Sequence, residues 1–300
     1  MVSKKVLLLS ALILAVGSGC TKTVEPTVLP ELPERESENM VGDLSITTAE
    51  IDKEFTLNAY ASCDVHIAYP QFTAGALPDI VALQTDHAIA HFVAGGLEYR
   101  GDVETTAELD AIATKYLSDC QEEIETEYRD LQNEDPMLFT NLKRSLDIVY
   151  NVKLNEGGRV SFGLDGYAYT GGAHPNQWME YITFDTTLDR PVKLSDIIAP
   201  EHLQHFMQHE AAALLADNRE NLYPEYADSF DAIIEAAEMT PETQMTEFGD
   251  FNKFYLTPTS IVTYYNAYDI APYAAGPIFV EIPFTDIADF VITPNTATSP

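Results

Sequence analysis

The sequence predicts an α+β fold, a mainly antiparallel sheet with helices inserted in blocks, and three observations support this. Several stretches alternate apolar and polar residues with the two-residue period of a strand. Other stretches repeat apolar residues with helical spacing, and they follow one another instead of separating every pair of strands. Hydrophobic residues make up 46% of the 300 residues, which is enough to build a sizeable core.

The first half is expected to begin with one long strand over residues 53–69, where Phe55, Cys63 and Ile67 belong to the same alternating apolar face. Helical spacing then predicts helices over residues 78–93 and 105–132. The second helix is acidic away from its apolar stripe, which is typical of a solvated face.

Strands return after the second helix. Residues 146–154 and 160–169 alternate on either side of an Asn-Glu-Gly-Gly turn, so they predict a hairpin. A further strand is expected near 178–186. The second half is then predicted as helices over 200–217 and 224–238, strands over 253–256, 261–266 and 278–282, and a short final helix over 284–290.

The N-terminus is typical of an exported lipoprotein. Lys4 and Lys5 precede a short apolar run, and small residues then lead to Cys20, as in a bacterial lipoprotein signal. We expect Cys20 to carry the lipid, with ordinary signal cleavage as the alternative. Thr21 stands where inner-membrane retention requires aspartate, so the expected location is lipid-anchored in the cell envelope, at the periplasmic face of the outer membrane.

The predicted domain organisation follows from these signals. Residues 1–19 are expected to be the signal peptide, and residues 20–45 a tether rich in proline and glutamate. One α+β domain would span residues 46–292, in two halves of about 46–199 and 200–292. Residues 293–300 have the composition of a disordered tail.

The net charge restricts the partners. Sixteen Lys and Arg residues stand against 48 Asp and Glu, giving a formal charge of −32. Such a surface repels nucleic acid and anionic lipid, so membrane contact is expected through the lipid anchor only. It attracts cationic partners. The alternative is that the acidic coat keeps an exported protein soluble or reflects a salty habitat.

Two further cysteines lie on apolar faces. Cys63 belongs to the first predicted strand and Cys120 to the apolar stripe of the second helix. Both are expected to point into a core outside the cytoplasm, where they can pair. A disulfide and two buried unpaired thiols both remain open.

Catalytic and metal-binding motifs are scarce. The sequence has no Gly-x-Ser-x-Gly elbow and no phosphate-binding or dinucleotide-binding glycine motif, and we expect no cofactor. The acids are too numerous to single out a catalytic carboxylate pair. His202, His205 and His209 form a helical stripe, which can hold zinc or copper; a polar flank of the helix is the alternative.

One glycine-rich stretch stands between two predicted strands: residues 169–176, Tyr-Thr-Gly-Gly-Ala-His-Pro-Asn. Gly171 and Gly172 can adopt positive φ, and Pro175 pushes His174 towards extended backbone. We expect a rigid reversal in which the His174 ring hydrogen-bonds a backbone carbonyl. Ligand contact and catalysis by His174 are the alternatives.

A second dense stretch covers residues 254–277 and contains five tyrosines. It ends in a Pro-Tyr-Ala-Ala-Gly-Pro turn that includes Gly276. Tyrosines are common at recognition surfaces and also in half-buried sheets. Tyr268 and Tyr273 are the binding candidates here, with Tyr169 and His174 from the first stretch.

These two stretches carry a resemblance. Tyr-Thr-Gly-Gly-Ala-His at 169–174, followed by Ile-Thr-Phe-Asp at 182–185, and Tyr-Asp-Ile-Ala-Pro-Tyr-Ala-Ala-Gly at 268–276 resemble an extracellular domain of unknown function. That domain is shared by the lysozyme-binding anti-sigma-V factor and the peptidoglycan deacetylase C family, and it also occurs in stand-alone lipoproteins. The resemblance covers roughly residues 50–290 and implies an α+β fold that can bind lysozyme.

The sequence also departs from both relatives. A deacetylase would need a separate domain with Asp and His metal ligands, and we expect none here. A sigma regulator would need a cytoplasmic segment, whereas Met1–Cys20 resembles an export signal. We therefore expect the family's external domain alone on a lipid tether.

The sequence thus predicts an envelope lipoprotein that binds a partner and is not an enzyme. The first candidate partner is a basic protein, lysozyme or a related muramidase, which the acidic chain would attract and inhibit. The second is a peptidoglycan fragment, bound or modified in a pocket near His174 and the loop at 268–276. A structural envelope lipoprotein without a soluble ligand is the third alternative.

Overall fold

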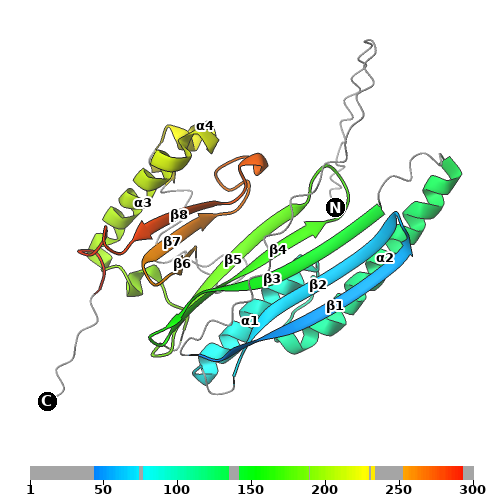
Figure 1. Ribbon diagram of the computed structural model, residues 1–300, viewed down its shortest axis with the longest axis horizontal. Helices are drawn as coiled ribbons and strands as arrows, with labels where there is room; N and C mark the ends of the chain where they lie inside the picture. The colour runs from blue at the N-terminus through cyan, green and yellow to red at the C-terminus, as the bar shows by residue number, and fades with distance from the viewer. Residues whose placement is uncertain are drawn as a thin grey trace, which may run out of the picture. The chain divides into compact units, whose positions relative to one another are not determined.

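The computed structural model describes residues 44–73, 77–134, 142–188, 190–229, 231–233 and 253–292 (Figure 1). They all belong to one compact unit, Met40–Pro300. The predicted signal peptide, Cys20, nearly all of the predicted tether and the predicted tail at 293–300 lie outside these residues.

The first half is built on a five-stranded sheet with its strands in sequence order. The strands are β1 (Ile46–Asn58), β2 (Ala61–Phe72), β3 (Leu142–Glu156), β4 (Arg159–Tyr169) and β5 (Asn176–Asp185). Neighbouring strands are antiparallel except β2 and β3, which run parallel because two helices connect them. The predicted α+β fold with a mainly antiparallel sheet is confirmed, as is the hairpin of β3 and β4.

The predicted long strand over 53–69 is wrong, because the chain folds back within it. Asn58 accepts a hydrogen bond from the Tyr60 backbone N–H at 2.8 Å, and β1 and β2 pair as a hairpin across this turn. Phe55 lies opposite Cys63. Since paired residues share a face, the apolar alternation continues in phase through the turn, and the sequence pattern hides the reversal.

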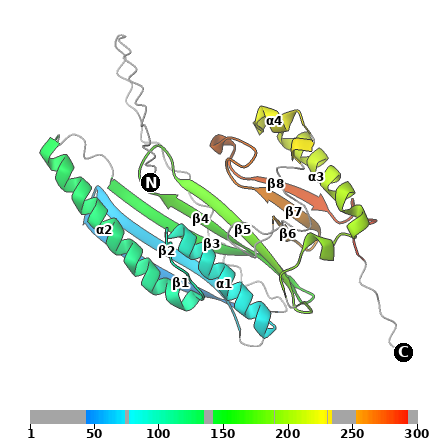
Figure 2. The same cartoon turned by 180° about the vertical axis from the view of Figure 1, so that it is seen from behind.

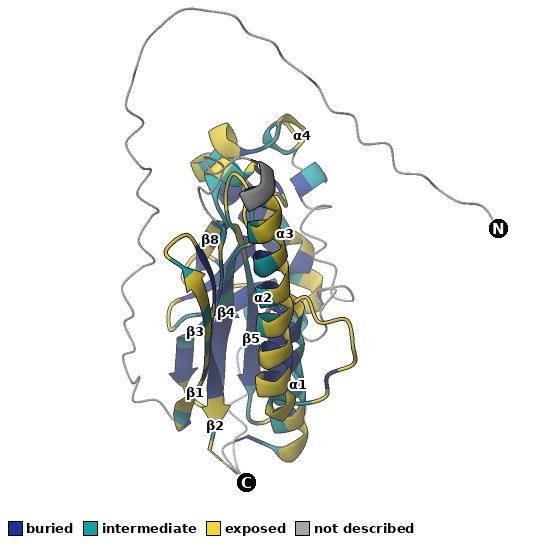
Figure 3. Ribbon diagram, turned by 90° about the vertical axis from the view of Figure 1, so that its right-hand side faces the viewer, coloured by how far each residue is buried: buried dark blue, intermediate teal, exposed yellow. Residues whose placement is uncertain are grey.

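Two helices cover one face of this sheet, as Figure 2 shows from behind. They are α1 (Asp79–Gly96) and α2 (Leu109–Glu134), close to their predicted positions. A continuous core joins α1 and α2 to the inward side chains of the sheet, among them Ile67, Ile148 and Phe162. The outward side of α2 is exposed (Figure 3).

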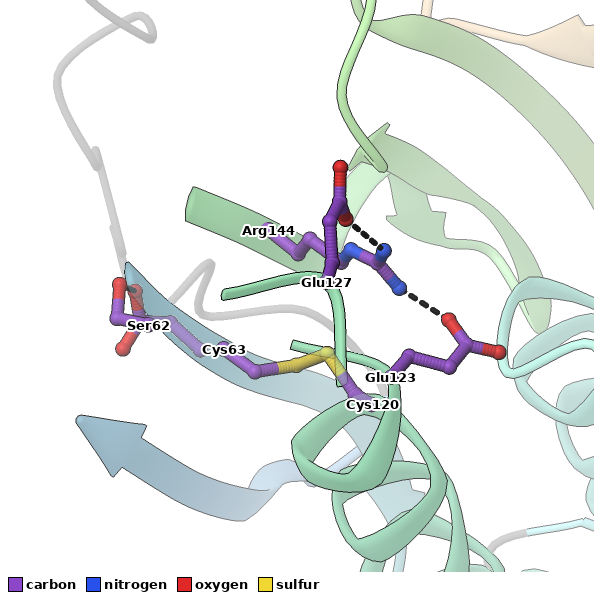
Figure 4. Close-up of a disulfide and its surroundings, with 7 residues drawn as sticks. Ser62, Cys63, Cys120, Glu123, Glu127 and Arg144 are labelled. Atoms are coloured by element: carbon purple, nitrogen blue, oxygen red, sulfur yellow. Dashed lines mark hydrogen bonds and ion pairs between the residues drawn. A yellow bond between two sulfur atoms is a disulfide. The ribbon is translucent and has the colours of Figure 1, made fainter. Parts of the chain in front are cut away.

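A disulfide joins β2 to α2. Cys63 and Cys120 are bonded, with their Cα atoms 6.5 Å apart, and Ala61 and Ile124 pack around them. Beside the disulfide, the Arg144 guanidinium lies between two carboxylates of α2, from Glu123 and Glu127 (Figure 4). Helix α2 is therefore held to the sheet by a covalent bond and by ion pairs.

The second half forms a separate three-stranded antiparallel sheet. It contains α3 (Leu203–Asn218), α4 (Pro224–Ala227), β6 (Phe254–Leu256), β7 (Ser260–Tyr265) and β8 (Ile278–Pro283), with β7 in the centre. The predicted helix over 224–238 lies partly outside the described residues. The predicted helix over 284–290 is wrong: Asp286 and Phe290 each donate to the carbonyl three residues earlier, so the segment forms turns.

The two sheets pack face to face. Val262 and Tyr264 of β7 pack with Tyr181 of β5, while Thr263 and Tyr265 of β7 hydrogen-bond Glu210 of α3. The layers are therefore α1 and α2, the five-stranded sheet, the three-stranded sheet and α3. Among the helices that the structure describes, none has the length and apolar composition needed to cross a membrane.

Candidate functional site

Side chains from both halves meet at an exposed aromatic cluster, which we define as His174, Tyr268 and Tyr273. The rings of His174 and Tyr273 stack with centroids 4.1 Å apart and planes inclined by 21°. The rings of Tyr268 and Tyr273 are 5.7 Å apart. The structure thus brings together three of the four residues that the sequence singled out for binding.

The β4–β5 loop presents His174 through its backbone geometry. Gly171 and Gly172 have φ values of +95° and +108°, which only glycine adopts without strain. The Tyr169 hydroxyl donates to the Gly172 carbonyl at 3.2 Å, so the fourth candidate braces the loop from within. His174 Nδ1 lies 2.9 Å from the Pro175 carbonyl oxygen, as the sequence predicts for a ring that locks the turn.

This contact sets the tautomer of His174. A carbonyl oxygen only accepts, so Nδ1 carries the hydrogen and Nε2 of the neutral ring is an acceptor. Nε2 lies 3.4 Å from the Tyr268 hydroxyl, which can donate to it. The histidine is thereby used as a bridge between the two halves, and both ring nitrogens have partners.

The connection between β7 and β8 presents the two tyrosines. Tyr268 has a φ of +76°, which is uncommon for a residue other than glycine. Its backbone is held by hydrogen bonds from the Tyr268 N–H to the Ala271 carbonyl, at 3.1 Å, and from the Asn266 N–H to Asp269 Oδ2, at 2.8 Å. Gly276, at φ +69°, turns the chain back into β8. A strained backbone at an exposed aromatic residue is typical of a contact site.

A row of polar side chains leads from this cluster across the sheet. In register, Asp52 of β1 pairs with His66 of β2, His66 with Asp147 of β3, and Asp147 with Tyr167 of β4. Paired residues project to the same side. Lys53, the neighbour of Asp52, reaches Asp110 of α2, so this polar row faces away from the helices.

The surroundings of the polar row are acidic. His66 Nδ1 lies 2.6 Å from Asp52 Oδ1, and Glu50, Glu54 and Asp64 project on the same side. At the other end, burial, then Tyr273 and Tyr169, raise the pKa of Tyr167. The row therefore continues from an acidic sheet face to the edge of the aromatic cluster.

Deeper on the same face lies a second, partly buried group. Burial raises the pKa of Asp165, opposed by Lys153 and by a 2.5 Å hydrogen bond from Asn151. Burial lowers the pKa of Lys153, whose Nζ lies 5.4 Å from the Tyr255 ring centroid. These residues lie where the two sheets meet, with Lys153 over the rings of Tyr181 and Tyr255.

Both ring nitrogens of His174 are engaged, Nδ1 with the Pro175 carbonyl and Nε2 with the Tyr268 hydroxyl. Within the described part of the chain, His, Cys, Asp and Glu side chains form no group of three that could hold a metal ion. His202 and His205 instead stack on Phe290, at centroid distances of 5.3 and 6.1 Å. His209 is not part of this stack.

Sequence reasoning missed Tyr167 and the polar row. The available signal was the alternation of Asp165, Tyr167 and Tyr169 along one strand, which places all three on one face. The cross-strand partners could not be found in the same way. They depend on the parallel pairing of β2 with β3, and no local pattern states that register.

Comparisons with known proteins match the two halves of the chain to two different families, and each match contains one of the two motifs. Residues 58–177 match the family described as Deacetylase PdaC, and residues 193–285 match the family described as Protein of unknown function (DUF3298). These matches confirm the resemblance carried by the motifs at 169–174 and 268–276. No curated protein matches the chain.

One solved structure shows the same fold, and a second gives a lower TM-score. A DUF3298 family member from Bacteroides fragilis superposes with a TM-score of 0.56 at 20% identity, covering 84% of this chain and 95% of that chain. A DUF3298 family protein from Pseudomonas aeruginosa gives a TM-score of 0.47 at 21% identity, covering 83% of this chain and 96% of that chain. At these identities the likeness to the first establishes the fold alone.

Proposed function

Because the chain carries a PdaC-type domain followed by a DUF3298 domain, we propose that it is a binding module of the cell envelope. Its contact surface would be the aromatic cluster together with the polar row. The partner would be a basic protein, lysozyme or a related muramidase, which binding would inhibit. The observation that carries this proposal is the continuity of exposed aromatic rings with an acidic sheet face.

The chemistry of the surface supports a cationic protein partner. Aromatic side chains with polar tips dominate the binding energy of many interfaces, and their ring faces attract arginine and lysine. Carboxylates around them steer a basic protein into place and speed association. The net charge of −32 adds a long-range attraction that salt screens.

The first test measures lysozyme binding by biolayer interferometry at several salt concentrations. Tyr273→Ala should weaken binding at least tenfold through faster dissociation, because it removes the ring at the centre of the aromatic cluster. Asp52→Asn should mainly slow association, by a few fold at low salt. Tyr60→Ala, at an exposed tyrosine on the β1–β2 turn, and Asp217→Asn, on the exposed side of α3, are the matched controls.

Two results would count against this partner. One is the absence of lysozyme binding at moderate salt by the folded wild-type chain. The other is equal weakening by Tyr273→Ala and Tyr60→Ala, which would separate binding from the aromatic cluster. Muramidase turnover measured with and without the chain then decides whether binding inhibits the enzyme.

Peptidoglycan fragments are a second candidate ligand. Tyr268 is 53% exposed beside the stacked His174 and Tyr273 rings, and aromatic faces with nearby hydroxyls also suit sugar rings. Titration with purified muropeptides tests this candidate. Muropeptide binding that Tyr273→Ala abolishes, with the circular dichroism spectrum unchanged and with no lysozyme binding by the wild type, would favour the fragments over the basic protein.

The proposed location is the cell envelope, through a lipid on Cys20. Cys20→Ser should abolish covalent labelling of the chain by a tagged fatty acid, because it removes the thiol that would carry the lipid. Labelling of cells that express both forms measures this. Equal labelling of the two forms would contradict a lipid on Cys20.

A further inference from the structure

The free edge of β5 is held by side chains of the second half instead of by another strand. Asn266 Oδ1 accepts from the Met179 N–H at 2.9 Å, and Asn266 Nδ2 donates to the Met179 carbonyl at 3.1 Å. Two residues on, the Tyr264 hydroxyl accepts from the Tyr181 N–H at 3.3 Å and donates to Glu180 at 2.9 Å. We call Glu180, Tyr264 and Asn266 the clasp.

Glu180 is the titratable member of the clasp and is only 6% exposed. Burial raises its pKa to about 7, while Lys253 and the Tyr264 hydroxyl oppose the rise and Asp269 adds to it. Lys253 Nζ lies 5.7 Å from the Tyr264 ring centroid, on the β6 side. The closed clasp therefore favours the protonated carboxyl, with one cation and one anion nearby.

The clasp also connects directly to the aromatic cluster. Tyr264 and Asn266 lead into the loop that carries Tyr268, and β5 begins just after the loop that carries His174. The Asn266 N–H is held by Asp269, within the same loop. The mutual position of His174 and Tyr268 thus depends on the contact between β5 and β7.

We propose that the clasp is a pH-sensitive joint, in which ionisation of Glu180 favours separation of the β7 loop from the edge of β5. An open joint would hydrate the carboxylate and free the Met179 and Tyr181 amides. The aromatic cluster would then lose its fixed geometry. This joint is a property of the chain itself and does not depend on which ligand binds.

The direction of the pH effect follows from the difference in proton binding by Glu180 between the closed and the open joint. In an open, hydrated joint Glu180 would ionise near its ordinary pKa of 4.5, whereas in the closed joint it ionises at about 7. Between these values the closed state binds more protons than the open state, so rising pH favours opening. The opening equilibrium should increase by up to tenfold per pH unit, by about 300-fold in all, and level off above about pH 7.

Amide hydrogen exchange of the wild-type chain, without ligand, tests the joint. After correction for intrinsic exchange, protection of the Met179 and Tyr181 amides should fall at least tenfold from pH 5 to pH 8. Protection of the Ile148 amide, in the core of β3, should stay higher than that of Met179 and Tyr181 at both pH values, because it reports global unfolding and not the opening of the joint. Equal protection of Met179 and Tyr181 at both pH values, or the same protection at these amides as at Ile148, would overturn the proposal.

Two variants assign the effect to Glu180. Glu180→Gln keeps an acceptor for Tyr264 and cannot ionise, so its protection should not change with pH. Glu210→Gln alters the other buried glutamate, which is bonded to Thr263 and Tyr265 outside the clasp, and should keep the wild-type pH profile. The same fall with pH in Glu180→Gln, or its loss in Glu210→Gln, would also overturn the proposal.

Tyr264→Phe provides a check that does not depend on titration. It retains the ring where the two sheets meet and removes both hydrogen bonds of the hydroxyl. Exchange at Tyr181 should then be faster at pH 5 than in the wild type, and its pH dependence should be smaller. Unchanged exchange at pH 5 would show that the hydroxyl does not close the joint.

Discussion

The strands β2 and β7 are both interior strands of their sheets, but their surroundings differ. All six residues of β7 are buried, because the five-stranded sheet covers one face and α3 the other. On β2 the residues from Ala61 to Tyr69 that face α1 and α2 are buried, while on the opposite face Asp64 is exposed and His66 half-exposed between buried neighbours. Strand β7 thus has no open face, whereas β2 is open to solvent at Asp64 and His66.

This difference gives the two halves different roles: the second half mainly packs, and the first half offers open surface. The second half contributes one exposed loop and uses the rest of its sheet as packing. The first half offers a broad polar face beside that loop. Thr263 and Tyr265 of β7 hydrogen-bond the buried Glu210, whereas Asp52 of the polar row is exposed and His66 half-exposed. Four kinds of substitution test this contrast, in order of decreasing expected effect.

The largest effect is expected from the disulfide, which is confined to the first half. Replacing both cysteines, Cys63→Ser with Cys120→Ser, opens a loop of 57 residues in the unfolded chain and should lower the free energy of unfolding by about 4 kcal/mol. Urea denaturation followed by circular dichroism measures the change. Equal midpoints for the oxidised wild type and the double variant would show that α2 needs no covalent link.

A smaller effect is expected from the buried carboxyl of the second half. Glu210 Oε1 accepts from the Thr263 hydroxyl at 2.7 Å and the Tyr265 hydroxyl at 2.8 Å. Glu210→Ala leaves both donors buried without this acceptor and should cost about 2–4 kcal/mol. Chemical denaturation at pH 6 provides the comparison, with Glu210→Gln as the conservative control.

The stability difference between Glu210→Gln and the wild type should also depend on pH. Burial raises the pKa of Glu210, so the folded state binds a proton that the unfolded state has released over part of the acidic-to-neutral range. Proton binding at Glu210 therefore stabilises the folded state at low pH. This stabilisation is lost as the pH rises through the pKa of Glu210 in the folded state. The stability of Glu210→Gln relative to wild type should therefore increase from pH 5 to pH 8. A constant difference would mean that Glu210 does not titrate abnormally.

A third, smaller effect is expected at Gly166 of β4, which packs against the ring of Trp178. A methyl group at Gly166 would come within 2.2 Å of the ring of Trp178, the only tryptophan in the chain. Gly166→Ala should cost about 1–3 kcal/mol and shift the tryptophan emission, because the ring must move. Unchanged emission and stability would mean that the ring is loosely packed.

The smallest effect is expected at the loop glycine. Gly171 has open space around it, so Gly171→Ala introduces no clash and only places alanine at a φ of +95°. The cost should be about 1 kcal/mol, with the Trp178 emission unchanged. Thermal denaturation compares it with Gly166→Ala. A larger loss at Gly171 than at Gly166 would reverse the expected order of backbone strain and side-chain packing.

Most elements were predictable because they depend on local periodicity. Helical spacing located α1, α2 and α3, and alternation located β3, β4 and β5. The hairpin of β1 and β2 was missed because its two-residue turn preserves the alternation. The apolar residues at 284–290 have helical spacing and so predict a helix, but the hydrogen bonds there span only three residues and form turns.

The candidate site was predictable in part. The loop with Gly171 and Gly172 and the tyrosines at 268 and 273 were recognisable as unusual stretches, and the structure places His174 between them. The clasp gave no signal, because no spacing along the chain connects Glu180 with Tyr264 and Asn266. Their role appears only when β7 lies against the edge of β5.

Composition and local pattern alone specified the acidic charge, the main helices and strands, the glycine and proline reversal and the apolar faces of the two cysteines. These features depend on neighbouring residues or on sums over the chain. The layer order, the parallel contact of β2 with β3 and the raised pKa of Glu180 required the tertiary structure. Glu180 meets Tyr264 across 84 residues of chain, and burial of this kind is a property of the packed fold that no short stretch of sequence contains.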